Sequence, residues 1–209
     1  GSEAHLAMKI DTYQSLESYD IASSSVSKNF EDAYDSEYGG ATAVKGNIAY
    51  IAKPNEDKNK IMLSKFDLLS GGSSEFAEIA GNGDQEIAIS GLAAAPQVNK
   101  IAVGVGYYES TVFQGESPAT YKVFTCDIGS GELTEVYSKN SPGVYFAATV
   151  NQWSAANELF VYEFIGDALG GAFGETIKIN LGDGSVDNLS SSYDIYGSAR
   201  VSPDGSRII

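Results

Sequence analysis

Histidine and cysteine, which supply many catalytic bases, nucleophiles and zinc ligands, are almost absent from this sequence. The chain has one histidine, His5, and one cysteine, Cys126. A serine nucleophile needs a neighbouring base, and a zinc ion needs several histidine or cysteine ligands. The sequence also has no Gly-x-Ser-x-Gly motif, the turn that presents the nucleophile in many hydrolases. We therefore expect neither serine-type catalysis nor zinc chemistry from these residues.

Oxygen-bearing side chains are the second chemical candidate. The stretches 55–59 and 82–86 place several Asn, Asp and Glu side chains close together, as a calcium ion requires. Neither stretch has the EF-hand pattern, and such clusters are more commonly solvated turns. Nothing in the sequence brings Glu158, Glu163 and Glu175 together as an acid–base pair, so we expect these carboxylates to be solvated. We predict no cofactor, with calcium as the open alternative.

Aromatic side chains are the third candidate, and they point to binding rather than catalysis. Three long stretches lie between predicted strands, at 53–60, 106–120 and 165–175. Aromatic rings on long loops can stack on sugars or fill a pocket of a partner protein, although they also serve simply to pack a loop down. The predicted ligand-binding residues are Tyr107, Tyr108, Glu109, Phe113, Phe173, Tyr145 and Tyr193.

The overall charge limits the class of partner. The chain has 13 Lys and Arg against 28 Asp and Glu, a formal net charge of −15, which repels the phosphates of nucleic acids. No apolar run is long enough to span a bilayer. Cys126 lies in an alternating apolar run, so we expect a buried thiol. A low cysteine content fits either the cytoplasm or a bacterial extracytoplasmic space. The 13 Tyr, 23 Gly and many Ser, with few Lys, favour an exported β-protein in an extracytoplasmic compartment.

A repeat of about fifty residues organises most of the chain. The turn residue before each predicted buried strand falls at Asn47, Asn99, Asn157 and Ser206. Each interval contains four predicted short strands. The first is apolar, the second alternates between apolar and polar residues, the third is polar and follows a Gly-rich turn, and the fourth consists of small residues and opens the next unit. Helical periodicity is absent. This pattern predicts an all-β fold, a β-propeller built of four-stranded antiparallel blades, with the small strand innermost and the polar strand at the rim.

The expected domain organisation follows from this repeat. Blades are predicted at about 41–86, 87–143 and 144–195, with an incomplete one at 196–209. Residues 1–40 are interpreted as a tag remnant, Gly1-Ser2, followed by an acidic segment that is a linker or a preceding strand, the strand being predicted from Ala7 to Tyr13.

The closing repeat resembles a known family. The run Val201-Ser202-Pro203-Asp204-Gly205-Ser206-Arg207-Ile208 is similar to the Ser-Pro-Asp-Gly repeat of TolB-like propellers, which are related to WD repeats. The Asp-x-x-Ser/Gly-Gly element of that family is echoed at Asp67 to Gly71 and at Asp127 to Gly131, whereas Asn180 replaces the Asp in the third unit. The resemblance implies a propeller fold over about residues 41–209.

Two functions remain open from the sequence. The first is a non-catalytic, exported binding module that engages a protein, peptide or glycan through its aromatic loops. The second is the propeller domain of a larger prolyl oligopeptidase-type serine peptidase. Closed propellers have about four to eight blades, so the remaining blades are expected from a missing part of the chain or, as the less favoured alternative, from a second chain.

Overall fold

The computed structural model describes residues 3–10, 13–20, 25–32, 40–83, 85–108, 118–141, 145–166, 172–193, 202 and 207. For residues 3–10, 13–20 and 25–32 and for residues 145, 172, 173, 192 and 193, it describes the backbone alone. Strands dominate these ranges, and the one helix within them is α1 (Leu189–Tyr193). None of the described helical structure has the length and hydropathy needed to cross a bilayer.

Three four-stranded antiparallel sheets follow one another along the chain, and we call them blades 1, 2 and 3. Consecutive strands pair with each other in every blade. Blade 1 contains β4 (Ala41–Lys45), β5 (Ile48–Pro54), β6 (Lys60–Asp67) and β7 (Ser73–Ala80). Blade 2 contains β8 (Glu86–Ala94), β9 (Lys100–Tyr108), β10 (Thr120–Asp127) and β11 (Leu133–Asn140), and blade 3 contains β12 (Tyr145–Trp153), β13 (Glu158–Gly166), β14 (Ala172–Asn180) and β15 (Val186–Asn188). The predicted all-β fold of four-stranded antiparallel blades is confirmed.

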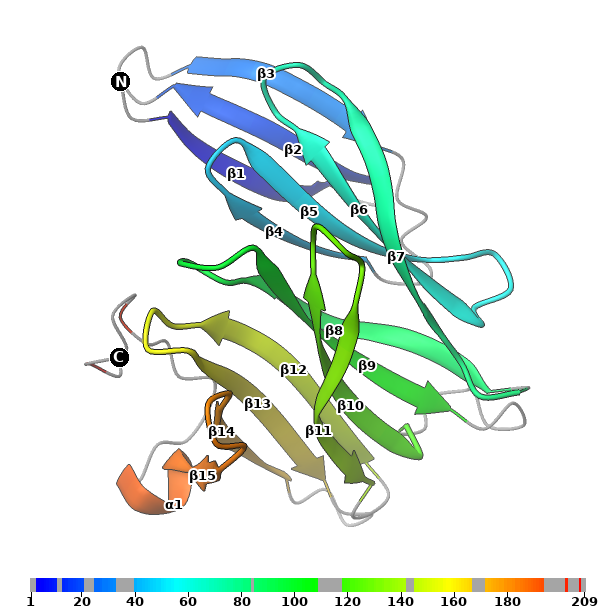
Figure 1. The fold of residues 1–209 in the computed structure, drawn as a ribbon, viewed down its shortest axis with the longest axis vertical. Coiled ribbons are helices and arrows are strands. Elements are labelled where there is room, and N and C mark those ends of the chain that lie inside the picture. Colours follow the sequence, from blue (N-terminus) through cyan, green and yellow to red (C-terminus); the bar gives the residue numbers. More distant parts are fainter. Residues whose placement is uncertain are drawn as a thin grey trace.

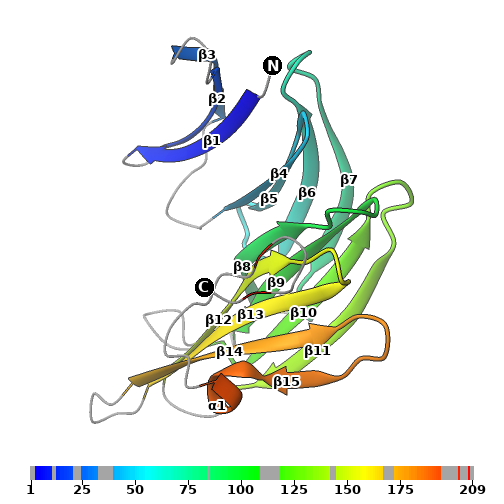
Figure 2. The ribbon, with the colours of Figure 1, turned by 90° about the vertical axis from the view of Figure 1, so that its left-hand side faces the viewer.

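The blades fan out from their first strands (Figures 1 and 2). In Figure 2, β4, β8 and β12 follow one another on one side, while β7 and β11 lie on the opposite side. The first strands can approach closely because they contain small residues. At Gly91 in β8, where φ is 108°, an added Cβ would overlap the backbone oxygen of Val150 in β12. Glycine is therefore required at this contact, in agreement with the prediction of a small innermost strand.

A hydrophobic core fills each junction between blades, because alternate residues of every strand face the neighbouring sheet. The first core joins Ile61 and Leu63 of β6 with Val103 and Val105 of β9. The second core joins Tyr121 and Val123 of β10 with residues of blade 3, among them Phe146, Leu159 and Val161. Each such side chain contributes about 1.5–3 kcal/mol when fully buried.

The outermost strands are polar, as an unpaired sheet edge requires. A lysine on the third strand of each blade forms an ion pair with an acidic residue on the fourth. The pairs are Lys60–Glu78 at 3.2 Å, Lys122–Glu135 at 2.7 Å and Lys178–Asp187 at 3.2 Å. Surface pairs of this kind are worth about 0–1 kcal/mol, so they protect the edges more than they stabilise the fold.

The same two turns recur in all three blades. Between the third and fourth strands, the side chain of Asp67, Asp127 or Asn180 accepts hydrogen bonds from the backbone of its own turn. Each turn then reaches a glycine with positive φ, namely Gly71 (75°), Gly131 (73°) and Gly184 (74°). The turn between the first two strands is joined to it: the carbonyls of Asn47, Asn99 and Asn157 accept from the N–H groups of Leu68, Ile128 and Leu181. Three of the four turn residues that defined the sequence repeat, Asn47, Asn99 and Asn157, therefore occupy equivalent places.

At the beginning of the fourth repeat, one backbone–backbone hydrogen bond is described. The backbone N–H of Ser202 donates to the carbonyl of Arg207 at 2.8 Å, and Ala95 and Lys100 make the equivalent bond in blade 2 at 2.9 Å. Residues 203–206, which carry the Pro-Asp-Gly turn, lie outside the described residues.

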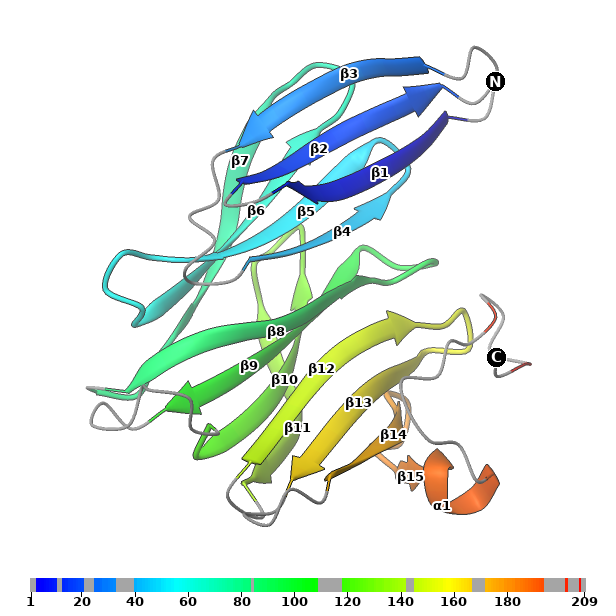
Figure 3. The ribbon, with the colours of Figure 1, turned by 180° about the vertical axis from the view of Figure 1, so that it is seen from behind.

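Residues 3–32 differ from their sequence interpretation. They form a three-stranded antiparallel sheet, β1 (Glu3–Ile10), β2 (Tyr13–Asp20) and β3 (Ser25–Asp32), instead of the single strand predicted from Ala7 to Tyr13 (Figures 1 and 3). A one-residue bulge in β3 opposite Ser18 and Tyr19 matches the bulges in β7 and β11. This sheet thus has the pattern of the last three strands of a blade. The prediction missed them because polar outer strands show little hydrophobic alternation.

Candidate functional site

Tyr107 does not lie on a loop. It is the penultimate residue of β9, is 4% exposed and belongs to the core between blades 1 and 2. Burial and, secondarily, the charge of Glu135 raise the pKa of Tyr107 to about 12, and Lys122 lies 5.6 Å from its ring centre. The sequence interpretation of Tyr107 as a loop residue is corrected, because the apolar alternation of β9 continues to the end of the strand.

Tyr108 ends the same strand and is half-buried. Its ring covers Gly106, where an added Cβ would lie 3.1 Å from a ring carbon, and burial raises the Tyr108 pKa. Glu109 and Phe113 lie outside the described residues. At this end of blade 2, Tyr108 therefore packs against its own strand.

The other predicted aromatic residues are described by their backbone. Tyr145 begins β12, Phe173 is the second residue of β14 and Tyr193 ends α1. Tyr145 pairs with Gly166 and Phe173 with Ile165, so the register places both at the same end of blade 3. Their role in binding remains a prediction.

The first predicted calcium stretch uses its amide oxygens within its own loop. The Oδ1 atom of Asn55 accepts from the backbone N–H groups of Asn59 and Lys60 at 3.0 and 2.9 Å. The Asn55 amide also donates to Oδ1 of Asn59 at 2.8 Å. In the ranges that the structure describes, no three His, Cys, Asp or Glu side chains are grouped to hold a metal ion. Calcium binding stays a prediction with no described ligand set.

A groove of about 530 Å³ lies at the short-turn end of the junction between blades 1 and 2. We call it the inter-blade groove. It is formed by the second, third and fourth strands of blade 1 and by two turns of blade 2, and its lining residues are Ile48, Tyr50, Lys65, Asp67, Gly72, Ser73, Ser74, Asn99, Ile128 and Gly129. Its volume is within the range of about 300–1,000 Å³ that is usual for ligand pockets.

Strand alternation determines the lining of the inter-blade groove. Ile61, Leu63, Lys65 and Asp67 share one face of β6, the face that packs against blade 2. The first two are fully buried, whereas Lys65 is exposed. The end of β6 that carries Lys65 and Asp67 therefore extends past the contact between blades 1 and 2. These two residues form a polar wall of the groove next to the apolar core. Ile48, Tyr50 and Ile128 supply the apolar floor.

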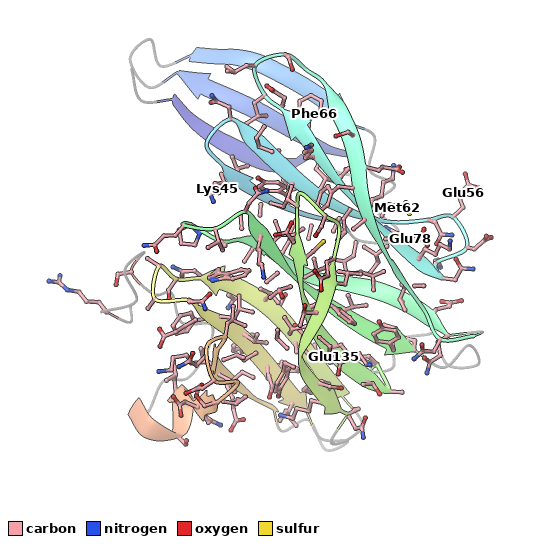
Figure 4. All side chains as sticks on the ribbon, viewed as in Figure 1. Lys45, Glu56, Met62, Phe66, Glu78 and Glu135 are labelled. Carbon is pink, nitrogen blue, oxygen red and sulfur yellow. The ribbon has the colours of Figure 1, made fainter. Side chains whose placement is uncertain are left out.

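The turns beside the groove are held in place by hydrogen bonds. The ammonium of Lys45 donates to the carbonyl of Val98 at 2.8 Å and so ties blade 1 to the turn before β9. In Figure 4, Lys45 lies at the end of β4, while Glu56 projects from the β5–β6 loop at the other end of the blade. Two exposed apolar residues flank the groove along the chain: Leu69, 57% exposed, and Val98, 46% exposed. The side-chain hydrogen bond of Lys45 thus joins the two blades beside the groove.

The equivalent position between blades 2 and 3 is closed. Tyr50 pairs with Lys65 in blade 1, and in blade 2 the corresponding pair is Ala102 and Thr125. Ala102 is 0% exposed and Thr125 is 6% exposed. Smaller side chains let blade 3 close over this end of blade 2, so the groove distinguishes the first junction from the second.

A buried carboxylate lies at the second junction. Glu163 of β13 is 0% exposed, accepts a hydrogen bond from the Tyr137 hydroxyl at 2.8 Å and forms an ion pair with Lys139. Both partners are on β11, so the network joins blades 2 and 3. Desolvation, followed by the hydrogen bond to Glu163, raises the pKa of Tyr137. The expectation of a solvated Glu163 is wrong, because it lies on the inward face of β13 with Leu159 and Val161.

Comparison with known proteins identifies the fold. No protein-family model and no curated protein matches the sequence. Solved structures do match. TolB from Acinetobacter baumannii matches with a TM-score of 0.56 and 13% identity, over 98% of this chain and 45% of the TolB chain. An acylaminoacyl peptidase from Pyrococcus horikoshii matches with a TM-score of 0.55 and 13% identity, over 99% of this chain and 32% of that one. A chain of a nidogen/laminin complex matches with a TM-score of 0.51 and 9% identity, over 88% and 60%.

The chain thus spans between about a third and three fifths of the length of these structures. At 9–13% identity the likeness concerns the fold alone. Together with the three four-stranded blades, it shows that the chain has a β-propeller fold similar to that of TolB.

Proposed function

We propose that this chain is a non-catalytic propeller module that binds a peptide segment of another protein in the inter-blade groove. The observation that carries the proposal is the groove itself, about 530 Å³ in volume, with an apolar floor and a charged wall. Such a mixture suits recognition, because apolar contacts supply affinity and a few polar groups fix the orientation of the ligand. The composition leads us to expect an exported protein, and an exported location is compatible with a binding role. Cell fractionation tests this location.

Small residues line the two sides of the groove. Gly72, Ser73 and Ser74 form one side of it, and Asn99 and Gly129 form the other. Walls of small residues leave room for an extended segment whose side chains enter the floor. The likeness to a chain of a nidogen/laminin complex supports a protein partner for this fold.

Selection of peptides followed by a filling mutation tests the proposal. Peptides from a displayed random library are selected on the chain, and their affinities are measured by calorimetry. Ser74 is exposed in the groove opposite Lys65, and Ser74→Trp is expected to fill the groove and weaken binding at least tenfold. Thr134 occupies the matching place in blade 2, opposite Thr125, where the junction is closed. Thr134→Trp is therefore the control, expected to leave the affinities unchanged.

The proposal fails if no selected peptide loses affinity in Ser74→Trp while that variant keeps the wild-type melting temperature. Loss in both tryptophan variants would also contradict it, because the effect would then not depend on the groove. The aromatic loops form a separate predicted surface. Tyr108→Ala tests it, with unchanged binding of a partner counting against that surface.

The second candidate function is a propeller domain of a larger serine peptidase. It is favoured by the match of 99% of this chain to 32% of an acylaminoacyl peptidase. In that case the natural polypeptide would also contain a hydrolase segment with a nucleophile elbow, which the complete coding sequence would reveal. In both cases we propose that further blades of the same polypeptide complete the ring.

A further inference from the structure

Lys65 lines the inter-blade groove, and among the described residues its ammonium has no partner. The other lysines whose side chains the structure describes each have a hydrogen bond, an ion pair or an electrostatic partner, among them Lys45, Lys60 and Lys122. Lys65 has none among the described residues, although it lines the groove with the carboxylate of Asp67. Oδ1 of Asp67 accepts from the N–H groups of Leu69 and Ser70 at 2.8 and 3.0 Å and is occupied by its own turn.

The position of Lys65 links a charge to an apolar surface. It pairs with Tyr50 on β5, and both residues line the groove together with Ile48 and Ile128. A ligand group seated against Lys65 therefore has an apolar floor beside it. The net charge of −15 repels anions from most of the surface, so Lys65 gives the groove a local positive charge at which one anionic group can be held.

We infer that the inter-blade groove binds the C-terminal end of a peptide, with the terminal carboxylate on Lys65 and an apolar last side chain on Ile48, Tyr50 and Ile128. The inference rests on the proposed peptide-binding function and specifies its ligand. A C-terminal residue places a carboxylate and a side chain on the same Cα, so one residue satisfies both the cation and the neighbouring floor. Capture of a terminal carboxylate is an established mode of peptide recognition, and the hydrogen bond to an ammonium is stronger than one between neutral groups.

Paired probes that differ in one group test this inference. The isotope-labelled chain is titrated with acetyl-Ala-Ala-Ala-Leu as the free acid and as the C-terminal amide, and chemical shifts of the lysine and isoleucine side chains are followed by NMR. The acid is expected to shift Lys65, Ile48 and Ile128 and to bind at least about tenfold more tightly than the amide. Replacement of the last leucine by serine is expected to weaken binding of the acid, because the floor then loses its apolar contact.

Variants of one strand supply the controls. Lys65→Gln should remove the preference for the acid, and Lys65→Arg should retain it, because guanidinium also binds carboxylate. Lys60→Gln changes a lysine of the same strand that is paired with Glu78 outside the groove, and the preference should be unchanged. Equal affinity for acid and amide, with shifts at the groove, would overturn the inference while leaving peptide binding intact. Chemical-shift changes confined to residues outside the groove would overturn the inference too. The proposed function is tested separately, because it is overturned by failure of the Ser74→Trp experiment.

Discussion

Loss of the cation at the buried carboxylate should destabilise the fold strongly. Lys139→Met removes the partner of Glu163, which is 0% exposed at the junction of blades 2 and 3. The Tyr137 hydroxyl still donates to Oε1, but the second oxygen loses its ion pair. An uncompensated charge then remains buried, which is far more costly than the loss of a surface contact.

The magnitude follows from the burial of the two partners. Breaking a buried ion pair by removing one partner costs about 3–5 kcal/mol. The side chain of Lys139 is 30% exposed, so water enters the site in the variant and the lower end of that range applies. A loss of about 3 kcal/mol corresponds to a fall of roughly 6–12 °C in the melting temperature for a chain of this size.

A lysine of blade 2 supplies a matched control. Lys122 pairs with the exposed Glu135 at 2.7 Å and lies 5.6 Å from the ring centre of Tyr107, much as Lys139 lies 5.5 Å from that of Phe146. Lys122→Met therefore loses a similar ring contact but leaves no buried charge. Its expected cost is about 0–1 kcal/mol.

Urea unfolding monitored by circular dichroism measures both variants. Adding Glu163→Gln to Lys139→Met should recover part of the loss, because a buried amide is less costly than a buried carboxylate. The reasoning is refuted if Lys139→Met costs no more than Lys122→Met, or if the double variant is less stable than Lys139→Met alone.

Three further predictions concern single sites in blades 2 and 3. Gly104→Ala should cost about 1–3 kcal/mol in unfolding measurements, because its Cβ would overlap the hydroxyl of the fully buried Tyr121. Gly174→Ala should cost less, because its Cβ would overlap the hydroxyl and ring of Tyr162, which is only half-buried. Hydrogen bonds from the turn lower the pKa of Asp127, and the one from the backbone N–H of Ser130 has the largest effect. The Asp127 carboxylate therefore stabilises the fold at pH values above its pKa in the unfolded chain, and this stabilisation is lost as the pH falls through its pKa in the folded chain. The stability advantage of wild type over Asp127→Asn should accordingly shrink on acidification, and a constant difference would contradict this. Burial and then the charge of Asp127 raise the pKa of Cys126 to about 11, so iodoacetamide at pH 8 should alkylate the native chain at least about 100-fold more slowly than the unfolded chain, as mass spectrometry can show.

The turns could be predicted from the sequence because they depend on nearby residues. Asp67 and Asp127 each accept hydrogen bonds from residues two and three positions ahead, and a glycine four positions ahead adopts positive φ. Such local geometry leaves a signature in composition and spacing. Repeated along the chain, it was sufficient to predict the number of strands in blades 1 to 3.

The candidate site could not be predicted in the same way, because it depends on the fit between sheets. Whether a junction is open is decided by pairs such as Tyr50 with Lys65 in blade 1 and Ala102 with Thr125 in blade 2. Nothing local distinguishes a lysine that lines a groove from one at an ordinary edge. The burial of Glu163 has the same origin, since its partners come from the preceding blade. The one available signal was a glutamate at an inward position of an otherwise apolar strand.

Blades 2 and 3 solve one packing problem with exchanged residues. In blade 2, Tyr121 of the third strand lies over Gly104 of the second, and in blade 3, Tyr162 of the second strand lies over Gly174 of the third. Either order fills the space between two strands, because a ring needs only a glycine diagonally across the ladder. Core residues can therefore change from blade to blade, whereas the hydrogen-bonded turns stay the same. This freedom explains how two chains with 13% identity, this one and TolB, can share a fold. Residues that open a groove at a single junction can likewise vary without a change of the fold.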